Sequence, residues 1–247
     1  GDVAEIEARL AGESDWEVEW VRRHRNKLRR GHLIGNRFRI VLSEPEGEVD
    51  QAREVAEALL ERGVPNFYGA QRFGRDGDNA LRGRAIVEGE RFDGPRWKRR
   101  LMCNAFQSEL YNRWLTERIE REWFDQLLVG DVAKKTDTGG LFEVEEIERE
   151  QSRFDAREIT FTGPIYGSDL WWASGEPGEL ERAILEASGI AEEQLDRAGL
   201  SGSRRRGRIQ LEELEVESAD RGVALSFSLP KGAYATVVLR EFVAESK

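Results

Sequence analysis

The spacing of apolar residues in the first quarter of the chain predicts alternating helices and strands. Residues 4–11 have the spacing of the end of a helix, and residues 16–20 then alternate apolar with acidic side chains, as in a half-buried strand. Residues 37–42 alternate arginines with Phe, Ile and Leu and predict a second strand. Apolar residues at 49–60 recur at helical spacing, and Gly63 follows as the helix stop.

One long helical pattern dominates the middle of the chain. Apolar side chains recur at helical spacing after Pro95, and no Gly or Pro interrupts residues 96–129. Because a helix of that length is long for a domain of this size, we expect a break near residue 120. Strands are predicted at 141–144 and 158–161, the second ending in a turn at 162–167, and a helix is predicted at 178–189.

The C-terminal part returns to a strand and a short helix. Residues 225–229 alternate, a Pro-Lys-Gly turn follows, and residues 234–242 have one apolar helical face. Together with the shift in composition after residue 75, this predicts an α+β fold with a discontinuous division. Residues 1–91 and 210–247 are expected to form one unit, into which residues 92–209 are inserted.

The stretch from Gly63 to Gly74 combines aromatic and hydrogen-bonding side chains between glycines. Its sequence, GVPNFYGAQRFG, is a poor core strand but suits the wall of a site for a flat ligand such as a nucleobase. Aromatic faces stack on bases with roughly 1–3 kcal/mol each, while amide and guanidinium groups hydrogen-bond to base edges. The alternative is a glycine-bounded strand and turn whose aromatic residues are core.

Basic residues are concentrated in one block, although the chain is acidic overall, with a formal net charge of −10. Residues 21–40 carry eight Arg or Lys and no acid, so this block is +8 and the rest of the chain is −18. It is either a solvated charged face or, as we favour, a phosphate-binding stripe for RNA. The predicted contacts are Arg22, Arg23, Arg25, Lys27, Arg29 and Arg30, with a second phosphate clamp at Arg204 and Arg205.

The cysteine and histidine counts exclude several kinds of site. The single Cys103 excludes an internal disulfide and lies in an apolar helical pattern that favours a buried thiol. Two histidines exclude a His-rich metal site, and we expect no metal. No apolar run approaches the roughly 20 residues of a membrane span, and the acidic N-terminus is unlike a signal peptide. We therefore expect a cytoplasmic protein with no membrane partner.

Four stretches of the chain together match one enzyme family. They are residues 24–38 (HRNKLRRG followed by LIGNRF), Gly63–Gly74, the pair Thr162–Pro164 and Gly202–Arg205, and residues 229–241 (LPKGAYATVVLRE). In this order they resemble the tRNA pseudouridine synthase D (TruD) family and span nearly the whole chain. The resemblance implies a pseudouridine synthase-like core, a mixed or antiparallel sheet with helices, interrupted by an inserted α+β domain of TRUD type.

The resemblance also implies an activity and a set of site residues. The reaction is the isomerisation of a D-arm uridine of tRNA to pseudouridine, by an enzyme expected to be a monomer and to use no cofactor or metal. The base must leave the stack, so it needs a pocket with an aromatic face and an amide for its edge. The resemblance places base recognition on Asn66, stacking on Tyr68 and packing against the nucleoside on Tyr234, with Phe67, Arg72 and Phe73 beside them.

The catalytic Asp of the family has no counterpart in these 247 residues. In the family it follows a Lys in a Gly-x-Lys-Asp motif, and this chain contains no Lys-Asp dipeptide. Since the motif precedes the strand predicted at 16–20, we expect the segment that carries it to be absent ahead of Gly1, and the chain alone to be inactive. Asp76 and Asp78 follow the base-binding run, but a glycine-rich polar turn explains them better.

Two functions compete with the leading hypothesis, which is that the chain supplies tRNA binding and part of the base pocket of a pseudouridine synthase. A noncatalytic RNA-binding module or RNA chaperone would keep the pocket without the reaction. A small-molecule enzyme on an α+β scaffold would fit the acidic charge but would leave the basic block of residues 21–40 unexplained.

Overall fold

The structure, a computed structural model, describes residues 2–11, 20–27, 33–43 and 49–243. Internal contacts divide the chain into two units, Gly1–Ile34 and Gly35–Lys247. In the first unit, helix α1 spans Val3–Ala11, as the sequence predicts, and residues 20–27 form neither helix nor strand. The strand predicted at 16–20 falls almost wholly outside the described residues.

A three-stranded antiparallel sheet forms the first layer of the second unit. Its strand order is β1-β9-β8, with β1 at Gly35–Ser43, β8 at Leu214–Ala219 and β9 at Gly222–Pro230. The strands predicted at 37–42 and 225–229 are therefore confirmed. The exposed face of β1 carries arginines paired with glutamates, Arg37 with Glu213 at 3.6 Å and Arg39 with Glu217 at 3.4 Å.

Two helices pack on the apolar face of this sheet. Helix α2 spans Val49–Arg62 and α8 spans Ala235–Arg240, and both contribute to one core cluster with the strands. The cluster includes Ala56 and Leu59 of α2, Leu225 and Phe227 of β9, and Val238 of α8. Both helices confirm the prediction from spacing, and Gly63 ends α2 with a φ of +81° that favours glycine.

A four-stranded antiparallel sheet forms the second layer, in the order β4-β3-β5-β6. The turn predicted at 162–167 is wrong, because Thr162–Ile165 continue β5 and pair with β6. Pro164 is tolerated there because β3 pairs only with residues 159–161, so that part of β5 has a partner on one side. The strands are β3 (Val132–Lys135), β4 (Leu141–Glu143), β5 (Ile159–Ile165) and β6 (Ser203–Arg206).

Helix α4 (Arg96–Glu120) packs across strand β5. Its last turn closes with Glu122 in the left-handed conformation (φ +62°) and a hydrogen bond from Trp123 N to Arg118 O at 2.9 Å. The break expected near residue 120 is therefore confirmed. The approach of helix to strand requires Gly163, since a Cβ at that position would lie 2.1 Å from the Trp114 ring.

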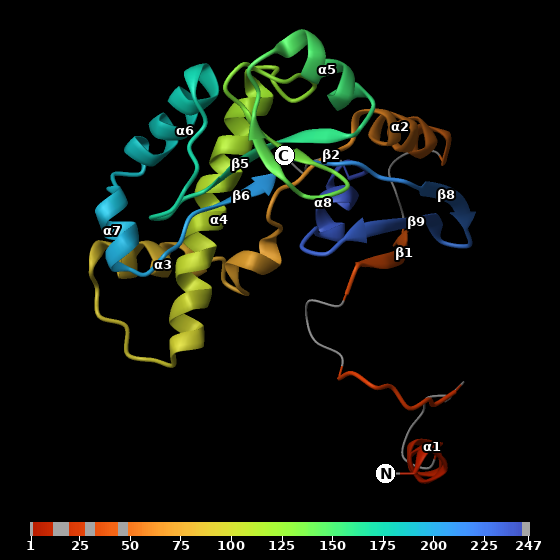
Figure 1. The fold of residues 1–247 in the computed structure, drawn as a ribbon. Coiled ribbons are helices and arrows are strands. Elements are labelled where there is room, and N and C mark those ends of the chain that lie inside the picture. The colour runs from red at the N-terminus through yellow and green to blue at the C-terminus, as the bar shows by residue number, and fades with distance from the viewer. Residues whose placement is uncertain (1, 12–19, 28–32, 44–48, 244–247) are drawn as a thin grey trace. The chain divides into compact units, whose positions relative to one another are not determined.

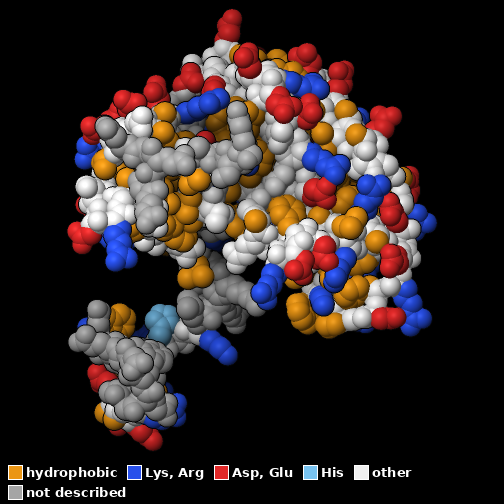
Figure 2. Space-filling model, turned by 180° about the vertical axis from the view of Figure 1, so that it is seen from behind, with side chains coloured by type: hydrophobic (Ala, Val, Ile, Leu, Met, Phe, Trp, Pro, Cys, Tyr) orange, Lys and Arg blue, Asp and Glu red, His pale blue; other side chains and the backbone are white. Residues whose placement is uncertain are grey.

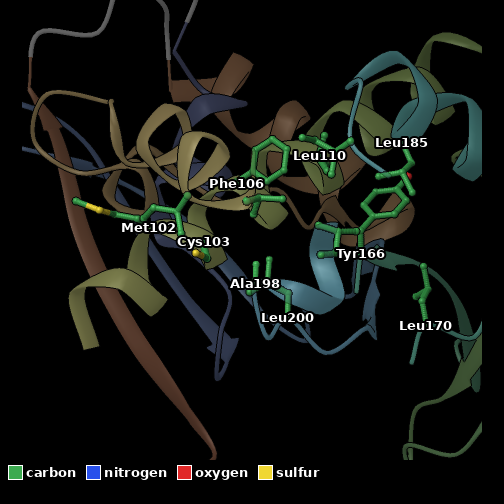
Figure 3. Close-up of a cluster of buried hydrophobic side chains, with 13 residues drawn as sticks. Met102, Cys103, Phe106, Leu110, Tyr166, Leu170, Leu185, Ala198 and Leu200 are labelled. Atoms are coloured by element: carbon green, nitrogen blue, oxygen red, sulfur yellow. The ribbon is translucent and has the colours of Figure 1, made fainter. Parts of the chain in front are cut away.

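A third group of helices encloses the other half of α4. Helices α3 (Asn79–Glu88), α6 (Gly175–Ala187) and α7 (Glu192–Arg197) surround a buried cluster drawn in Figure 3, in which Phe106 and Leu110 of α4 face Tyr166. Sequence spacing missed α3, because the glycines and charges of residues 75–95 obscure its apolar positions. Helix α5 (Ile147–Asp155), which covers β5, was also missed.

The two sheets draw on different parts of the chain. Residues 35–43 and 214–230 make the three-stranded sheet, while residues 132–206 make the four-stranded one. A short ladder of β2 (Val64–Pro65) with β7 (Arg208–Ile209) joins the two parts. The predicted division at residues 91 and 210 remains a prediction, and α3, which lies before residue 92, packs on α4.

The surface of the described residues mixes acidic and basic side chains, as Figure 2 shows for one face. Most of the ion pairs there join partners that are both more than a quarter exposed, so each contributes little to stability. Within the described ranges, no helix has the length and apolar character needed to cross a bilayer.

Candidate nucleotide-binding site

The stretch Gly63–Gly74 is tied to the segment after β6 through Asn66. Its main-chain N–H donates to Gly207 O at 2.9 Å, and its side-chain Nδ2 donates to Arg206 O at 2.8 Å. Its Oδ1 accepts from Arg205 Nη2 at 2.6 Å. Asn66 is thus held on both the main chain and the side chain, with 7% of its surface exposed.

Tyr68 is positioned by a reciprocal pair of hydrogen bonds with Asn112 of α4. Tyr68 N donates to Asn112 Oδ1 at 2.8 Å, and Asn112 Nδ2 donates to Tyr68 O at 2.9 Å. The Tyr68 ring meets Tyr111 and Tyr234 edge to face, with centroids 5.6 Å and 6.1 Å apart. Gly69 permits this approach, since a Cβ there would lie 2.6 Å from Thr236 Oγ1. Tyr68 and Tyr234, predicted from distant parts of the sequence, therefore lie together.

Two guanidinium groups flank the Tyr68 ring. The Arg205 guanidinium lies 3.9 Å from the ring centroid and that of Arg72 lies 5.2 Å from it. Arg72 Nε also donates to Ser108 Oγ at 2.9 Å. A cation over a tyrosine face contributes about 0.5–2 kcal/mol, depending on how far it is desolvated. The site is therefore an aromatic wall with fixed positive charge on it.

Three side chains of α4 belong to this site and were not predicted. Asn112 and Ser108 hold Tyr68 and Arg72, and Tyr111 donates from its hydroxyl to Arg206 O at 2.8 Å. Burial raises the pKa of Tyr111, against the attraction of Arg205, so its hydroxyl stays protonated and remains a donor. The sequence signal is Asn104, Ser108 and Asn112, a polar stripe at spacing four on a largely buried helix.

Phe67 and Phe73 occupy different environments from Tyr68. Phe67 is half-buried and packs against the clusters of both layers, as a core residue does. Phe73 is half-buried in the 3₁₀ turn η2 (Ala70–Phe73). Contact of either ring with a ligand stays a prediction.

Arg204 was predicted to bind phosphate, and the structure corrects this. Its guanidinium is 1% exposed and forms an ion pair with Glu181 at 2.7 Å. It also donates to Thr162 O at 2.6 Å and to Trp171 O at 3.1 Å. Burial raises the pKa of Glu181, and the Arg204 charge counteracts that rise. Arg204 therefore supports the four-stranded sheet and its helices from inside.

The predicted phosphate stripe can be described only in part. Arg22, Arg23, Arg25 and Lys27 are exposed, and the Arg22 guanidinium lies 5.9 Å from the Trp20 ring centroid. Arg29 and Arg30 lie outside the described residues. Phosphate binding by this block stays a prediction.

In the part of the chain that the structure describes, carboxylates stand apart from the cluster around Tyr68. Among the described residues, no Asp or Glu forms a hydrogen bond or ion pair with Asn66, Tyr68, Arg72 or Arg205. Asp78 instead pairs with Arg82 at 2.7 Å. The described part of the chain also contains no group of three or more His, Cys, Asp or Glu that could hold a metal ion. The cluster has the aromatic and cationic groups to hold a flat ligand, and none of the described carboxylates is bonded to it.

Curated proteins with sequences similar to this chain share one name. A curated protein named tRNA pseudouridine synthase D, from Anaeromyxobacter dehalogenans, is 46% identical over 227 residues, which cover 89% of this chain and 64% of that protein. A protein of the same name from Thermus thermophilus is 43% identical over 218 residues, 88% of this chain and 60% of that protein. The chain therefore spans less than two thirds of the length of these relatives.

The fold is shared with a solved structure. A crystal structure from Methanosarcina mazei, described as a tRNA pseudouridine synthase D, matches with a TM-score of 0.77 at 23% identity and covers 98% of this chain and 76% of that chain. The model of the family described as tRNA pseudouridine synthase D (TruD) matches residues 2–93 and 95–242. With nearly every residue inside that match and two relatives above 40% identity, the chain belongs to the TruD family of tRNA pseudouridine synthases.

Proposed function

We propose that this chain takes part in the isomerisation of a D-arm uridine of tRNA to pseudouridine. The observation that carries the proposal is the Tyr68 ring, flanked by Tyr234 and by the guanidinium groups of Arg72 and Arg205. A flipped base needs a π-face and hydrogen-bond donors, and its phosphates need nearby cations. The cluster provides all three.

The reaction exchanges one bond of the uridine for another. The bond between N1 and C1′ breaks, the base turns, and a bond between C5 and C1′ forms, while C5 loses a proton and N1 gains one. The sequence holds no Lys-Asp dipeptide, and no carboxylate bonds to the described pocket residues. We propose that this chain supplies tRNA binding and part of the base pocket, and that the catalytic Asp comes from a segment outside it.

Tritium release tests this division of labour. tRNA carrying tritium at C5 of uridine loses its label when C5 bonds to ribose. The 247-residue chain should bind this tRNA and release no tritium, whereas the complete reading frame that contains the chain, with an in-frame Gly-x-Lys-Asp, should release one tritium per modified uridine. Release by the chain alone would place the catalytic residue within it. A complete frame without the motif would favour the noncatalytic RNA-binding module.

The basic block of residues 21–40 is proposed to bind tRNA phosphates. Because each neutralised phosphate releases counterions, the logarithm of affinity should fall with the logarithm of salt concentration by about 0.7–0.9 per contact. Replacing Arg22, Arg23, Arg25 and Lys27 by Ala should lower that slope by roughly 3. An unchanged slope would show that residues 21–40 do not contact the tRNA phosphates.

The organisation of the protein is proposed on the same basis. Residues 1–91 and 210–247 are the pseudouridine synthase core and residues 92–209 the inserted TRUD-type domain, which is supported by the separate sheets of the two parts. The complete enzyme is proposed to act as a monomer in the cytoplasm, where its tRNA substrate is. Sedimentation of the complete protein with and without tRNA would test the oligomeric state.

A further inference from the structure

The side chain of Asn66 is already occupied within the protein. Nδ2 donates to Arg206 O at 2.8 Å, and Oδ1 accepts from Arg205 Nη2 at 2.6 Å. The main chain adds bonds from Asn66 N to Gly207 O at 2.9 Å and from Arg205 Nε to Asn66 O at 3.2 Å. With 7% of the residue exposed, little of this amide is left to read a base edge.

Arg205 is the group that Asn66 orients. It is half-buried, and its guanidinium lies 3.9 Å from the centroid of Tyr68 and 5.4 Å from that of Tyr111. Besides its bonds to Asn66, Nη2 donates to Gly232 O at 3.1 Å, which connects Arg205 to the turn before Tyr234. These bonds use Nε and Nη2, and the Arg205 side chain also hydrogen-bonds with the Tyr111 hydroxyl, so the donors that remain for a ligand lie beside the tyrosine rings.

We propose that Arg205 presents the hydrogen-bond donors to the target uracil, and that Asn66 is a positioning residue that acts through Arg205. The inference rests on the proposed function. Uracil carries carbonyl acceptors at C2 and C4, whereas cytosine carries an amino donor at C4, which faces a guanidinium unfavourably. Arg205 therefore selects uridine over cytidine. A lysine would keep the charge but not the rigid, planar arrangement of donors of the guanidinium group.

A double-mutant cycle in the complete protein separates the two roles. Arg205→Lys keeps the charge, so the affinity for tRNA should stay within about twofold while kcat falls roughly 10- to 100-fold. Asn66→Ala should lower kcat less, and adding it to Arg205→Lys should change kcat by less than about twofold. If the two losses multiply instead, Asn66 reads the base by itself and the proposal fails.

Controls keep this test separate from folding and from the proposed function. Arg197→Ala removes an exposed arginine of helix α7, which donates to Glu193 O at 3.2 Å, and should leave kcat unchanged. Binding of oligo(U) and oligo(C) to the 247-residue chain gives a readout without catalysis. The wild type should prefer oligo(U), and Arg205→Lys should lose that preference while its melting temperature falls by only about 2–4 °C. A wild type that isomerises tRNA with no such preference overturns the role of Arg205, whereas an inactive complete protein overturns the proposed function.

A separate surface lies at the start of helix α4, where four of five residues are basic. Residues 96–100 (RWKRR) include no acid, and Arg96, Lys98 and Arg100 form no ion pair with any described residue. Further along the same helix, exposed arginines are paired, Arg113 with Glu109 and Arg121 with Glu117. Although the chain has a net charge of −10, the positive charges of Arg96, Lys98 and Arg100 therefore have no acidic partner among the described residues.

Trp97 stands exposed among these cations. It has 68% of its surface exposed, and none of the described rings or guanidinium groups contacts it. Leu101, one turn further on, is 38% exposed. An exposed aromatic ring within a run of cations is the combination that single-stranded nucleic acids bind, through phosphate contacts and base stacking.

We propose that residues 96–101 form a second RNA-contact surface, at which the cations bind tRNA phosphates and Trp97 stacks on an unpaired base. The partner that fits is RNA, because a polyanion with exposed bases complements both the cations and the exposed ring. This surface also rests on the proposed function.

Paired arginines of helix α3 and of helix α4 with its C-cap offer a matched control for the charges. Replacing Arg96, Lys98 and Arg100 by Ala should lower the salt slope of tRNA binding by roughly 2 to 3, whereas replacing the paired Arg84, Arg113 and Arg121 should leave it unchanged. Trp97→Ala should weaken binding roughly 5- to 100-fold, and Trp97→Phe should restore most of it. Equal effects of the two triple variants, or no effect of Trp97→Ala, overturn this surface. A wild type that does not bind tRNA overturns the proposed function.

Discussion

Two neighbouring arginines of strand β6 point to opposite faces of the strand. Arg204 points into the helical core, where Glu181 and the carbonyl oxygens of Thr162 and Trp171 surround it. Arg205 points to the aromatic site, where Asn66 and Tyr68 hold it. A strand alternates its side chains with period two, so a run of arginines on it serves two environments. The comparison teaches that one basic motif can combine a buried ion pair on one face with a half-buried cation over aromatic rings on the other.

The largest expected effect comes from leaving Arg204 unpaired. Glu181→Ala leaves a buried charge without its partner and also removes the acceptor of Ala173 N. The free energy of unfolding should fall by about 3–5 kcal/mol, measured by urea denaturation. Arg205→Lys, the matched change on the other face, should cost about 1 kcal/mol. Similar losses at both positions would contradict the contrast between the two faces.

Labelling of the Cys103 thiol gives a second measure of the stability of the core around Arg204. The thiol is buried in the cluster with Tyr166, whose hydroxyl donates to Glu181 O at 2.8 Å, and burial raises the pKa of Cys103. Because the reactive thiolate is scarce and shielded, labelling of this thiol should track opening of the core. Glu181→Ala should speed labelling by roughly 100-fold or more, and Arg205→Lys by far less.

A smaller effect is expected where β5 supports β6. Gly163→Ala would put a methyl group 2.1 Å from the Trp114 ring, so the helix or the strand must shift. We expect a loss of about 1–3 kcal/mol in unfolding free energy, measured by thermal and urea denaturation. Gly140→Ala is the control, because the nearest atom to its Cβ lies at 3.5 Å, and it should change stability by less than about 0.5 kcal/mol.

The smallest change in stability is expected on the aromatic face. Asn112→Ala removes two hydrogen bonds to the main chain of Tyr68 and should cost about 1–2 kcal/mol. Its effect on the complete enzyme should be larger in kcat than in tRNA affinity, since phosphate contacts set affinity while base contacts set position. A loss in affinity equal to the loss in kcat would show that Tyr68 does not depend on Asn112 for its orientation.

Local sequence pattern predicted the elements whose periodicity is undisturbed. Helix α2 and strands β1 and β9 each have one apolar face, and α2 and β9 end at a glycine and a proline. The turn predicted at 162–167 was wrong because Gly163 and Pro164 are in β5 for reasons of tertiary contact. Gly163 makes room for Trp114, and Pro164 lies where β5 is paired on one side only.

The sequence named residues that the structure brings together, but it did not predict the partners that they contact, and their roles toward a ligand stay predictions. The family resemblance directed attention to Asn66, Tyr68 and Tyr234, and the structure brings the rings of the two tyrosines together. The different positions of Arg204 and Arg205 could not be predicted without knowing that residues 203–206 are a strand between a helical core and the aromatic cluster. Likewise, the polar stripe on α4 can be assigned to the site only once it is known that the segment with Tyr68 and Arg72 packs against it.

The clamp between Asn66 and Arg205 joins residues that are 139 positions apart. At translation rates of about 5–20 residues per second, roughly 7 to 28 seconds separate the synthesis of its two halves. Closing so long a loop is entropically costly, and only folding of the intervening sheet and helices brings the ends together. A nascent chain therefore cannot close this clamp until Arg205 has been made and the segments between its two halves have folded.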